Sequence, residues 1–213
     1  SPSPQIFSLL AAGGHTWKDD TYGPHQVEFF PAFGFSHDAL SNYADVQCGL
    51  FGDIANDTLS DVAYVMGDEI SETSDEGPSA LPGIGGALVE AIVRALFASP
   101  AWKHTALFIT YDENGGMADH VPPVKACPPD GLQPHDGNGN ALPGAFDTTG
   151  FRVPFIVVSP YAKAHYVSHV VYDHTSVVRF IEARFGLPAL SARDANATPP
   201  YDAFDFQNPP FVT

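Results

Sequence analysis

One short segment limits what this chain can fold into: an apolar run that stops abruptly at two adjacent carboxylates. Residues 106–111 read Ala-Leu-Phe-Ile-Thr-Tyr, a β-branched and aromatic run typical of a buried strand. Asp112 and Glu113 follow at once. Two glycines, Asp119, His120 and two prolines then prevent the strand from continuing. The sequence therefore predicts a strand with acidic side chains at its carboxyl end, the edge at which open α/β sheets bind ligands.

The adjacent carboxylates favour a site for a hard divalent cation. Two carboxylates repel each other unless a cation or a proton relieves them, and oxygen ligands suit calcium, magnesium or manganese. Adjacent strand residues point to opposite faces, so both reach one ion only if the backbone turns, which Gly115 and Gly116 permit. His120 is then a candidate to bind an anionic group or carry a proton. A solvated turn that merely ends the strand is the alternative.

The segment TYDENGGMADHVPP, residues 110–123, resembles the signature of the phosphoesterase family that holds bacterial phospholipases C and acid phosphatases. Three flanking segments resemble the same family: PQIFSLLAAGGHTWK, SPAWKHTALFITYDE and GFRVPFIVVSPYAKAHYVSHVVYDHTSVVRFIEARFGLPAL. The resemblance is weakest over residues 23–61 and 125–149. It implies an alkaline-phosphatase-like α/β fold, with a mostly parallel sheet flanked by helices, and metal-assisted hydrolysis of a phosphate ester.

The resemblance also implies roles for individual residues. Asp112 and Glu113 match the metal ligands of the family. Asp119 and His120 match an acid–histidine pair at or near its site, and they are the predicted catalytic residues together with His174. His174 lies in a segment that recurs in the family, where a capping or packing role is as consistent with the sequence as a substrate contact.

The chain also departs from the family pattern. Asn114 stands where the common form has histidine, and an aromatic residue is missing near Met117-Ala118, so the choice between a phosphomonoester and a phospholipid substrate stays open. Full-length members carry a Glu-Asn metal motif and a serine or threonine nucleophile upstream of the segment matched by residues 6–18, and neither is found here. We therefore predict that residues 1–213 are the C-terminal portion of a single phosphoesterase domain, completed by an N-terminal half or companion chain.

A non-catalytic binding or structural subunit that keeps the fold is the alternative from another functional class. The missing nucleophile favours it, whereas the intact Asp-Glu and Asp-His motif speaks against it. A Ser-His-Asp hydrolase is disfavoured, because the chain has no Gly-x-Ser-x-Gly elbow.

Charge narrows the set of partners. Nine lysines and arginines against twenty-five acidic residues give a formal charge of −16, which disfavours nucleic acid and anionic membranes. A phosphate site in such a chain needs a cation to invert the local field. No apolar stretch reaches the roughly 20 residues of a membrane span, and we expect a secreted or periplasmic protein. Cys48 and Cys127 allow one disulfide or two thiols.

Hydrophobic periodicity predicts further elements. Helices are expected over residues 4–12, 85–97 and 177–185, and strands over 16–18, 62–66 and 152–158. Strand 62–66, helix 85–97 and strand 106–111 are predicted to form one right-handed βαβ unit. Three segments are predicted to be loops: an aromatic-rich one over residues 19–60, an acidic one over 68–76, and a turn-rich one over 124–150 whose Asp-Gly-Asn-Gly-Asn run lacks the closing glutamate of an EF-hand.

Overall fold

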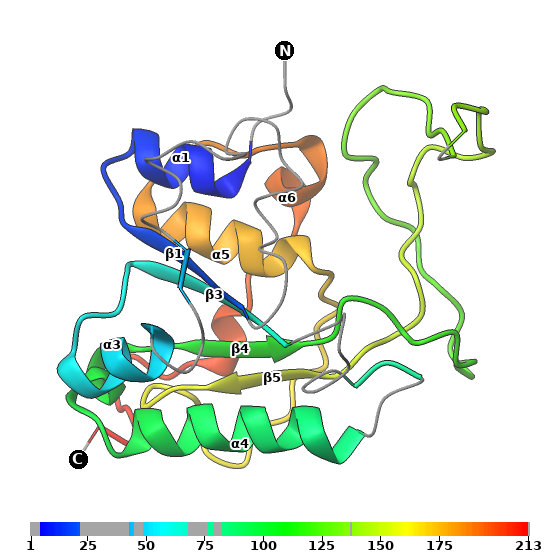
Figure 1. The fold of residues 1–213 in the computed structure, drawn as a ribbon. Helices are drawn as coiled ribbons and strands as arrows, with labels where there is room; N and C mark the ends of the chain where they lie inside the picture. The colour runs from blue at the N-terminus through cyan, green and yellow to red at the C-terminus, as the bar shows by residue number, and fades with distance from the viewer. Residues whose placement is uncertain are drawn as a thin grey trace. The chain divides into compact units, whose positions relative to one another are not determined.

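The computed structural model describes residues 5–21, 43–44, 49–67, 76–78, 82–136 and 138–212 (Figure 1). Helices and strands alternate in a mixed α/β arrangement and group into two compact units, residues 1–106 and 107–213. Each unit contains a small sheet of its own, and each is considered by itself. The prediction of a single domain stays a prediction.

The first unit is built on a parallel sheet with the strand order β2-β1-β3. Its elements are α1 (Ile6–Ala12), β1 (Trp17–Thr21), β2 (Tyr43–Ala44), α3 (Phe51–Asn56), β3 (Val62–Met66), α4 (Pro82–Phe97) and the 3-10 helix η3 (Pro100–His104). Central strand β1 aligns with β3 from Trp17 opposite Val62 to Thr21 opposite Met66. The predicted elements over residues 4–12, 16–18, 62–66 and 85–97 are thus present, within a few residues of their expected bounds.

The two faces of β1 contact different helices. Side chains alternate along a strand, so Trp17 lies on one face and Lys18 on the other. Phe7 of α1 packs on Trp17 with ring centroids 4.7 Å apart, whereas Asp53 of α3 forms an ion pair with Lys18. Helix α1 then ends at two glycines, the second with a φ of +78°. Helix α1 therefore contacts one face of β1, and helix α3 contacts the other.

Two aspartates are buried in this sheet. Asp19 and Asp20 are 0% and 1% exposed, although aspartate is normally depleted in strands. Neither oxygen of the Asp20 carboxylate has a hydrogen-bond partner among the described residues. Burial raises the pKa of Asp20 to about 6, Lys18 opposes this rise, and Asp53 and Asp19 add to it. Asp20 is thus a buried acid that holds a proton at mildly acidic pH.

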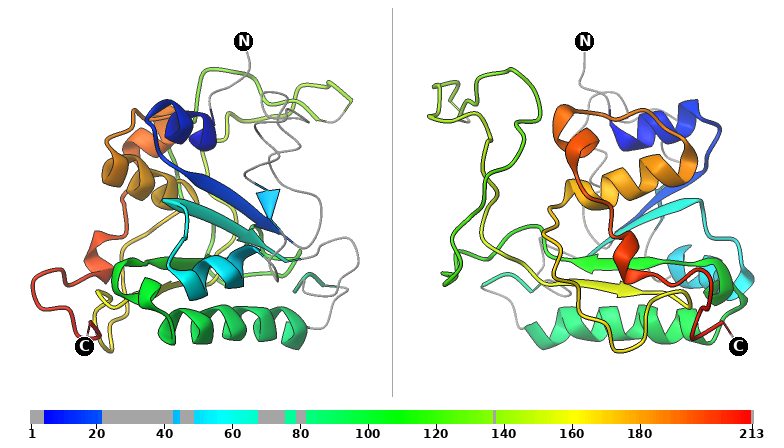
Figure 2. Two further views of the ribbon diagram at one scale, coloured as in Figure 1. Left: turned by 60° about the vertical axis from the view of Figure 1, so that its left-hand side comes forward. Right: turned by 180° about the vertical axis from the view of Figure 1, so that it is seen from behind.

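The second unit is built around an antiparallel pair of strands (Figure 2). Its elements are β4 (Leu107–Thr110), β5 (Phe155–Val158), α5 (Thr175–Phe185), α6 (Ala192–Asn196) and the 3-10 helix η4 (Tyr201–Ala203). Phe108 of β4 meets Phe180 of α5 edge to face, with ring centroids 5.0 Å apart. Phe204, 5% exposed, stacks on Phe180 at 5.5 Å. Aromatic rings therefore join the strands, α5 and the C-terminal segment.

Three predictions about these elements need correction. The predicted βαβ unit is wrong, because β3 pairs with β1 whereas β4 pairs antiparallel with β5 in a separate sheet. The strand predicted over residues 152–158 begins at Phe155, since Pro154 has no N–H to donate to a ladder. The loop predicted over 19–60 contains the end of β1, strand β2 and helix α3. Its residues 22–42 and 45–48 lie outside the described part of the chain.

A long loop connects β4 to β5 and extends away from the strands of its unit (Figure 1). Isolated bridges pair Lys125 with Thr148 and His135 with Ala141. The Asp136 carboxylate accepts the backbone N–H groups of Asn138 and Asn140, at 2.9 and 2.8 Å. Its oxygens are thus occupied by local donors, as expected for a turn-rich loop. The acidic segment predicted over 68–76 lies outside the described residues apart from Glu76.

Two sequence-based expectations concern cysteines and membrane spans. Cys127 carries a free thiol in the structure, and Cys48 lies outside the described residues. Among the described helices, none is both long and apolar enough to cross a membrane.

Asp20→Asn tests the buried acid. A pKa raised from 3.8 to about 6 means that the stability contributed by the neutral carboxyl is present below pH 4 and is lost as the pH rises through 6. We expect the free energy of unfolding to fall by roughly 3 kcal/mol over this range in the unsubstituted protein and to vary much less in Asp20→Asn. Denaturant unfolding at pH 4, 6 and 8 measures this.

Glu90→Gln is the matched control, because Glu90 is an exposed acid of α4 that pairs with Arg94 in the same unit. It should keep the pH dependence of the unsubstituted protein. An equally flat profile in both variants would contradict the assignment to Asp20.

Candidate functional site

Residues 111–120 follow β4 and are called the acidic loop here, as distinct from residues 68–76. Strand β4 stops at Thr110, and Asp112 and Glu113 follow with exposed side chains. Gly115 and Gly116 then have φ values of +60° and +72°, in the left-handed region that side chains disfavour. The two glycines thus turn the backbone immediately after the carboxylates, as the sequence predicts.

Each of the two carboxylates is held by a backbone N–H. Asp112 Oδ1 accepts the N–H of Glu113 at 2.9 Å, and Glu113 Oε2 accepts the N–H of Gly115 at 2.8 Å. These hydrogen bonds use one oxygen of each carboxylate. Within the part of the chain that the structure describes, no group of three or more acidic, histidine or cysteine side chains is placed to hold a metal ion. Two carboxylates are by themselves fewer oxygen ligands than a hard cation takes, so an ion bound here would need ligands from elsewhere.

Asp119 is paired with an arginine from the far end of the long loop. Arg152 Nε donates to Asp119 Oδ2 at 2.7 Å, and Arg152 Nη2 donates to Oδ1 at 2.8 Å. The N–H of Val121 donates to Oδ1 at 3.1 Å. These hydrogen bonds, above all those from Arg152, hold the pKa of Asp119 well below its usual range. Asp119 is therefore ionised and paired, which makes it a poor proton acceptor.

His120 lies beside this ion pair. Its Nδ1 is 3.5 Å from Asp119 Oδ1, and its side chain is 88% exposed. An exposed imidazole that follows a fixed carboxylate is free to contact a bound anion or to exchange a proton with it.

His174 lies at the start of α5 and contacts the base of the acidic loop. Its Nε2 is 2.8 Å from the backbone oxygen of Tyr111, the residue before Asp112. A carbonyl oxygen only accepts, so Nε2 is the protonated nitrogen of the ring. The capping function lies on the preceding residue instead, because Asp173 Oδ1 accepts the N–H of Thr175 at 2.8 Å. The structure therefore gives His174 a contact that secures the end of β4.

The segment before His174 is fastened by one carboxylate. Asp202 accepts hydrogen bonds from the hydroxyl groups of Tyr166, at 2.8 Å, and of Ser168, at 2.6 Å. The hydroxyl of Tyr172 donates to its other oxygen. Burial opposes ionisation of Asp202, but the donors from Ser168 and Tyr166 help to lower its pKa. Three hydroxyl groups on one carboxylate thus fix the chain that leads to α5.

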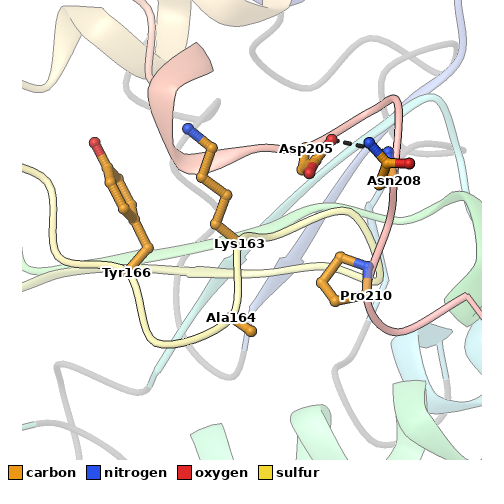
Figure 3. Close-up of a pocket in the computed structure, with 6 residues that line it drawn as sticks. All are labelled: Lys163, Ala164, Tyr166, Asp205, Asn208 and Pro210. Carbon is orange, nitrogen blue, oxygen red and sulfur yellow. Dashed lines mark hydrogen bonds between the residues drawn. The ribbon is translucent and has the colours of Figure 1, made fainter.

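A cavity of about 320 Å³ lies beside this segment (Figure 3). It is lined by Lys163, Ala164, Tyr166, Asp205, Asn208 and Pro210. The Lys163 ammonium lies 4.8 Å from the centroid of the Tyr166 ring, and Asp205 Oδ1 accepts the N–H of Asn208 at 2.8 Å. The lining contains no pair of acids and no histidine, so the cavity lacks the groups that phosphoester chemistry needs.

The structure brings the predicted site residues together in part. Asp112 and Glu113 share one loop, Asp119 and His120 are in contact, and His174 reaches the backbone before Asp112. Sequence reasoning missed Arg152, which is 33 residues from its partner and has no local signal. It also missed the hydroxyl groups around Asp202, because no short spacing links positions 166–172 to position 202.

Comparison with known proteins identifies the family. Residues 3–188 match the phosphoesterase family, and the chain belongs to it.

Several relatives are phospholipases C. The chain is 34% identical over 218 residues to a non-hemolytic phospholipase C of Burkholderia pseudomallei, which covers 90% of this chain and 30% of the relative. It is 35% identical over 170 residues to phospholipase C B of Mycobacterium tuberculosis, which covers 74% of this chain and 32% of the relative. It is 40% identical over 134 residues to non-specific phospholipase C6 of Arabidopsis thaliana, which covers 57% and 25%. The chain thus spans about a third or less of the length of these relatives.

Asp202→Ala tests whether the hydroxyl cluster stabilises the second unit. The substitution leaves three hydroxyl groups without their acceptor, and we expect it to lower the free energy of unfolding by about 2–3 kcal/mol. Denaturant unfolding followed by circular dichroism measures the loss.

Asp147→Ala is the control, because it removes an acid that pairs with Lys125 at the exposed surface of the same unit. Such pairs contribute little, so this variant should unfold like the unsubstituted protein. Equal losses in both variants would contradict a specific role of Asp202.

Proposed function

We propose that this chain is part of a metal-dependent phosphoester hydrolase, in which Asp112 and Glu113 bind a divalent cation. The observation that carries the proposal is the pair of carboxylates at the carboxyl end of β4. Each has one oxygen held by a backbone N–H. Membership of the phosphoesterase family supports the reaction class.

The fit of the cation rests on the donor set. Two adjacent carboxylates suit calcium, magnesium or manganese, which prefer oxygen ligands. When bound, such an ion polarises phosphoryl oxygens and offsets developing negative charge. It also offers an attractive site to a phosphate in a chain whose formal charge is −16.

The remaining residues bind, orient or carry protons. His120, exposed beside Asp119, contacts the phosphate or donates a proton to the leaving group. His174 holds the carbonyl of Tyr111 and thereby the start of the acidic loop. Asp119 orients its neighbours through its ion pair with Arg152 and does not carry protons, because a paired carboxylate of low pKa takes up no proton at neutral pH.

The whole protein extends beyond these residues in our proposal. The chain spans 30% of the Burkholderia relative and 32% of the Mycobacterium relative, so an N-terminal half or companion chain is expected to supply the nucleophile and the missing metal ligands. The complete protein would have an alkaline-phosphatase-like fold and act in the periplasm or outside the cell. Since the similar proteins are named phospholipases C, we propose a phospholipid headgroup ester as the substrate, in preference to a phosphomonoester.

Asp112→Asn in the full-length protein tests the metal ligand. We expect calorimetric affinity for manganese to fall at least 100-fold and hydrolysis of phosphatidylcholine to fall by a similar factor, because one charged ligand is lost. Asp130→Asn removes the same charge from the long loop, where Asp130 accepts the N–H of Leu132, and should leave both values unchanged.

The same assays separate the alternatives. Metal binding without turnover of phosphatidylcholine or p-nitrophenyl phosphate would favour a non-catalytic subunit. Turnover of p-nitrophenyl phosphate alone would favour an acid phosphatase. Unchanged metal affinity in Asp112→Asn would overturn the ligand assignment.

A further inference from the structure

We propose that Arg152 is a positioning residue for His120, which it holds in place through the carboxylate of Asp119. The inference rests on the proposed role of His120 at the phosphoester and adds a residue that reaches the site from the far end of the long loop. It is carried by the geometry of the ion pair and of the backbone around it.

Arg152 holds Asp119 with two nitrogens at once. The contacts from Nε to Oδ2 and from Nη2 to Oδ1, at 2.7 and 2.8 Å, form a two-pronged ion pair. The Asp119 side chain is 13% exposed and that of Arg152 is 59% exposed, so the carboxylate is largely shielded from solvent whereas the guanidinium is not. A planar fork fixes the orientation of a carboxylate as well as its position, whereas a lysine ammonium acts as a point charge.

The carboxylate in turn shapes the backbone at His120. Because Asp119 Oδ1 accepts the N–H of Val121 at 3.1 Å, residues 119–121 form an Asx turn with His120 at its centre. The His120 Nδ1 lies 3.5 Å from the same oxygen. Holding Asp119 therefore fixes the point from which the exposed imidazole projects.

Arg152 also balances the charge next to the imidazole. Among the described residues, Asp119 is the charged side chain in contact with His120, and Arg152 is the cation that faces this carboxylate. If the Arg152 guanidinium is removed, the negative charge of Asp119 is no longer offset next to the imidazole of His120. An opposite charge at this distance favours the protonated form of histidine.

The test is an NMR titration of His120 in the full-length protein with labelled histidines, the signal being identified by its loss in His120→Gln. In Arg152→Gln we expect the pKa of His120 to rise by about 0.5–1. The double variant Arg152→Gln with Asp119→Asn should abolish the rise, because the carboxylate is gone. Lys125→Gln is the matched control, since Lys125 pairs with Asp147 in the same unit, and it should leave the pKa of His120 unchanged.

Two further variants separate charge from geometry. Arg152→Lys keeps the charge, so the pKa of His120 should stay near its original value. The lysine loses the two-nitrogen contact that orients Asp119, so kcat should fall about 10-fold or more. Asp119→Asn removes the negative charge that lies 3.5 Å from the imidazole, so it should lower the pKa of His120. This variant decides the matter if Arg152→Gln does not fold.

An unchanged pKa of His120 in folded Arg152→Gln, or in Asp119→Asn, would overturn the proposal. A shift of the same size in Lys125→Gln would do so too, because it would show a general charge effect. If the unsubstituted protein hydrolyses no phosphoester, the proposed function fails, yet the titration still decides whether Arg152 governs His120.

Discussion

The second unit depends on the contact between Phe108 of β4 and Phe180 of α5. This contact, with Phe204 stacked against Phe180, aligns a strand end with a helix start although 63 residues separate Tyr111 from His174. The ring contacts hold the two elements that carry these hydrogen-bonded residues. The chemistry proposed for the acidic loop therefore rests on an apolar cluster that takes no part in it.

The acidic loop is secured at both ends by side chains distant in sequence. His174 holds the backbone where the loop begins, and Arg152 holds Asp119 where it ends. Between these points, Asp112 and Glu113 use one oxygen each for local hydrogen bonds. A preorganised ligand site requires a segment that is held at both ends and carries carboxylate oxygens available to a ligand between them.

The sequence predicted the local features of this site well. The apolar run that ends at Asp112, and the turn at Gly115 and Gly116, follow from strand propensity and from the freedom of glycine at positive φ. The pairing of β4 was predicted wrongly, because a strand does not encode which strand it pairs with.

Distant contacts were also beyond sequence reasoning. Any of the nine lysines and arginines is a candidate partner for Asp119 when the fold is unknown. The burial of Asp19 and Asp20 contradicts ordinary composition rules, which place aspartate at the surface. Metal binding, the catalytic roles and the companion half remain predictions.

The long loop between β4 and β5 closes on itself near its base. Ala126 donates its N–H to the carbonyl of Asp147, and Thr149 donates to that of Val124, both at 2.9 Å. The ion pair of Arg152 with Asp119 lies just outside this closure. The carbonyls of Pro129 and Phe146 are bonded to residues 192 and 193, at the start of α6, so the stretch whose described hydrogen bonds are all internal lies between them. Insertions or deletions between residues 130 and 145 therefore leave the strand pair and the acidic loop in register, and the chain length of this stretch can vary without moving either strand end.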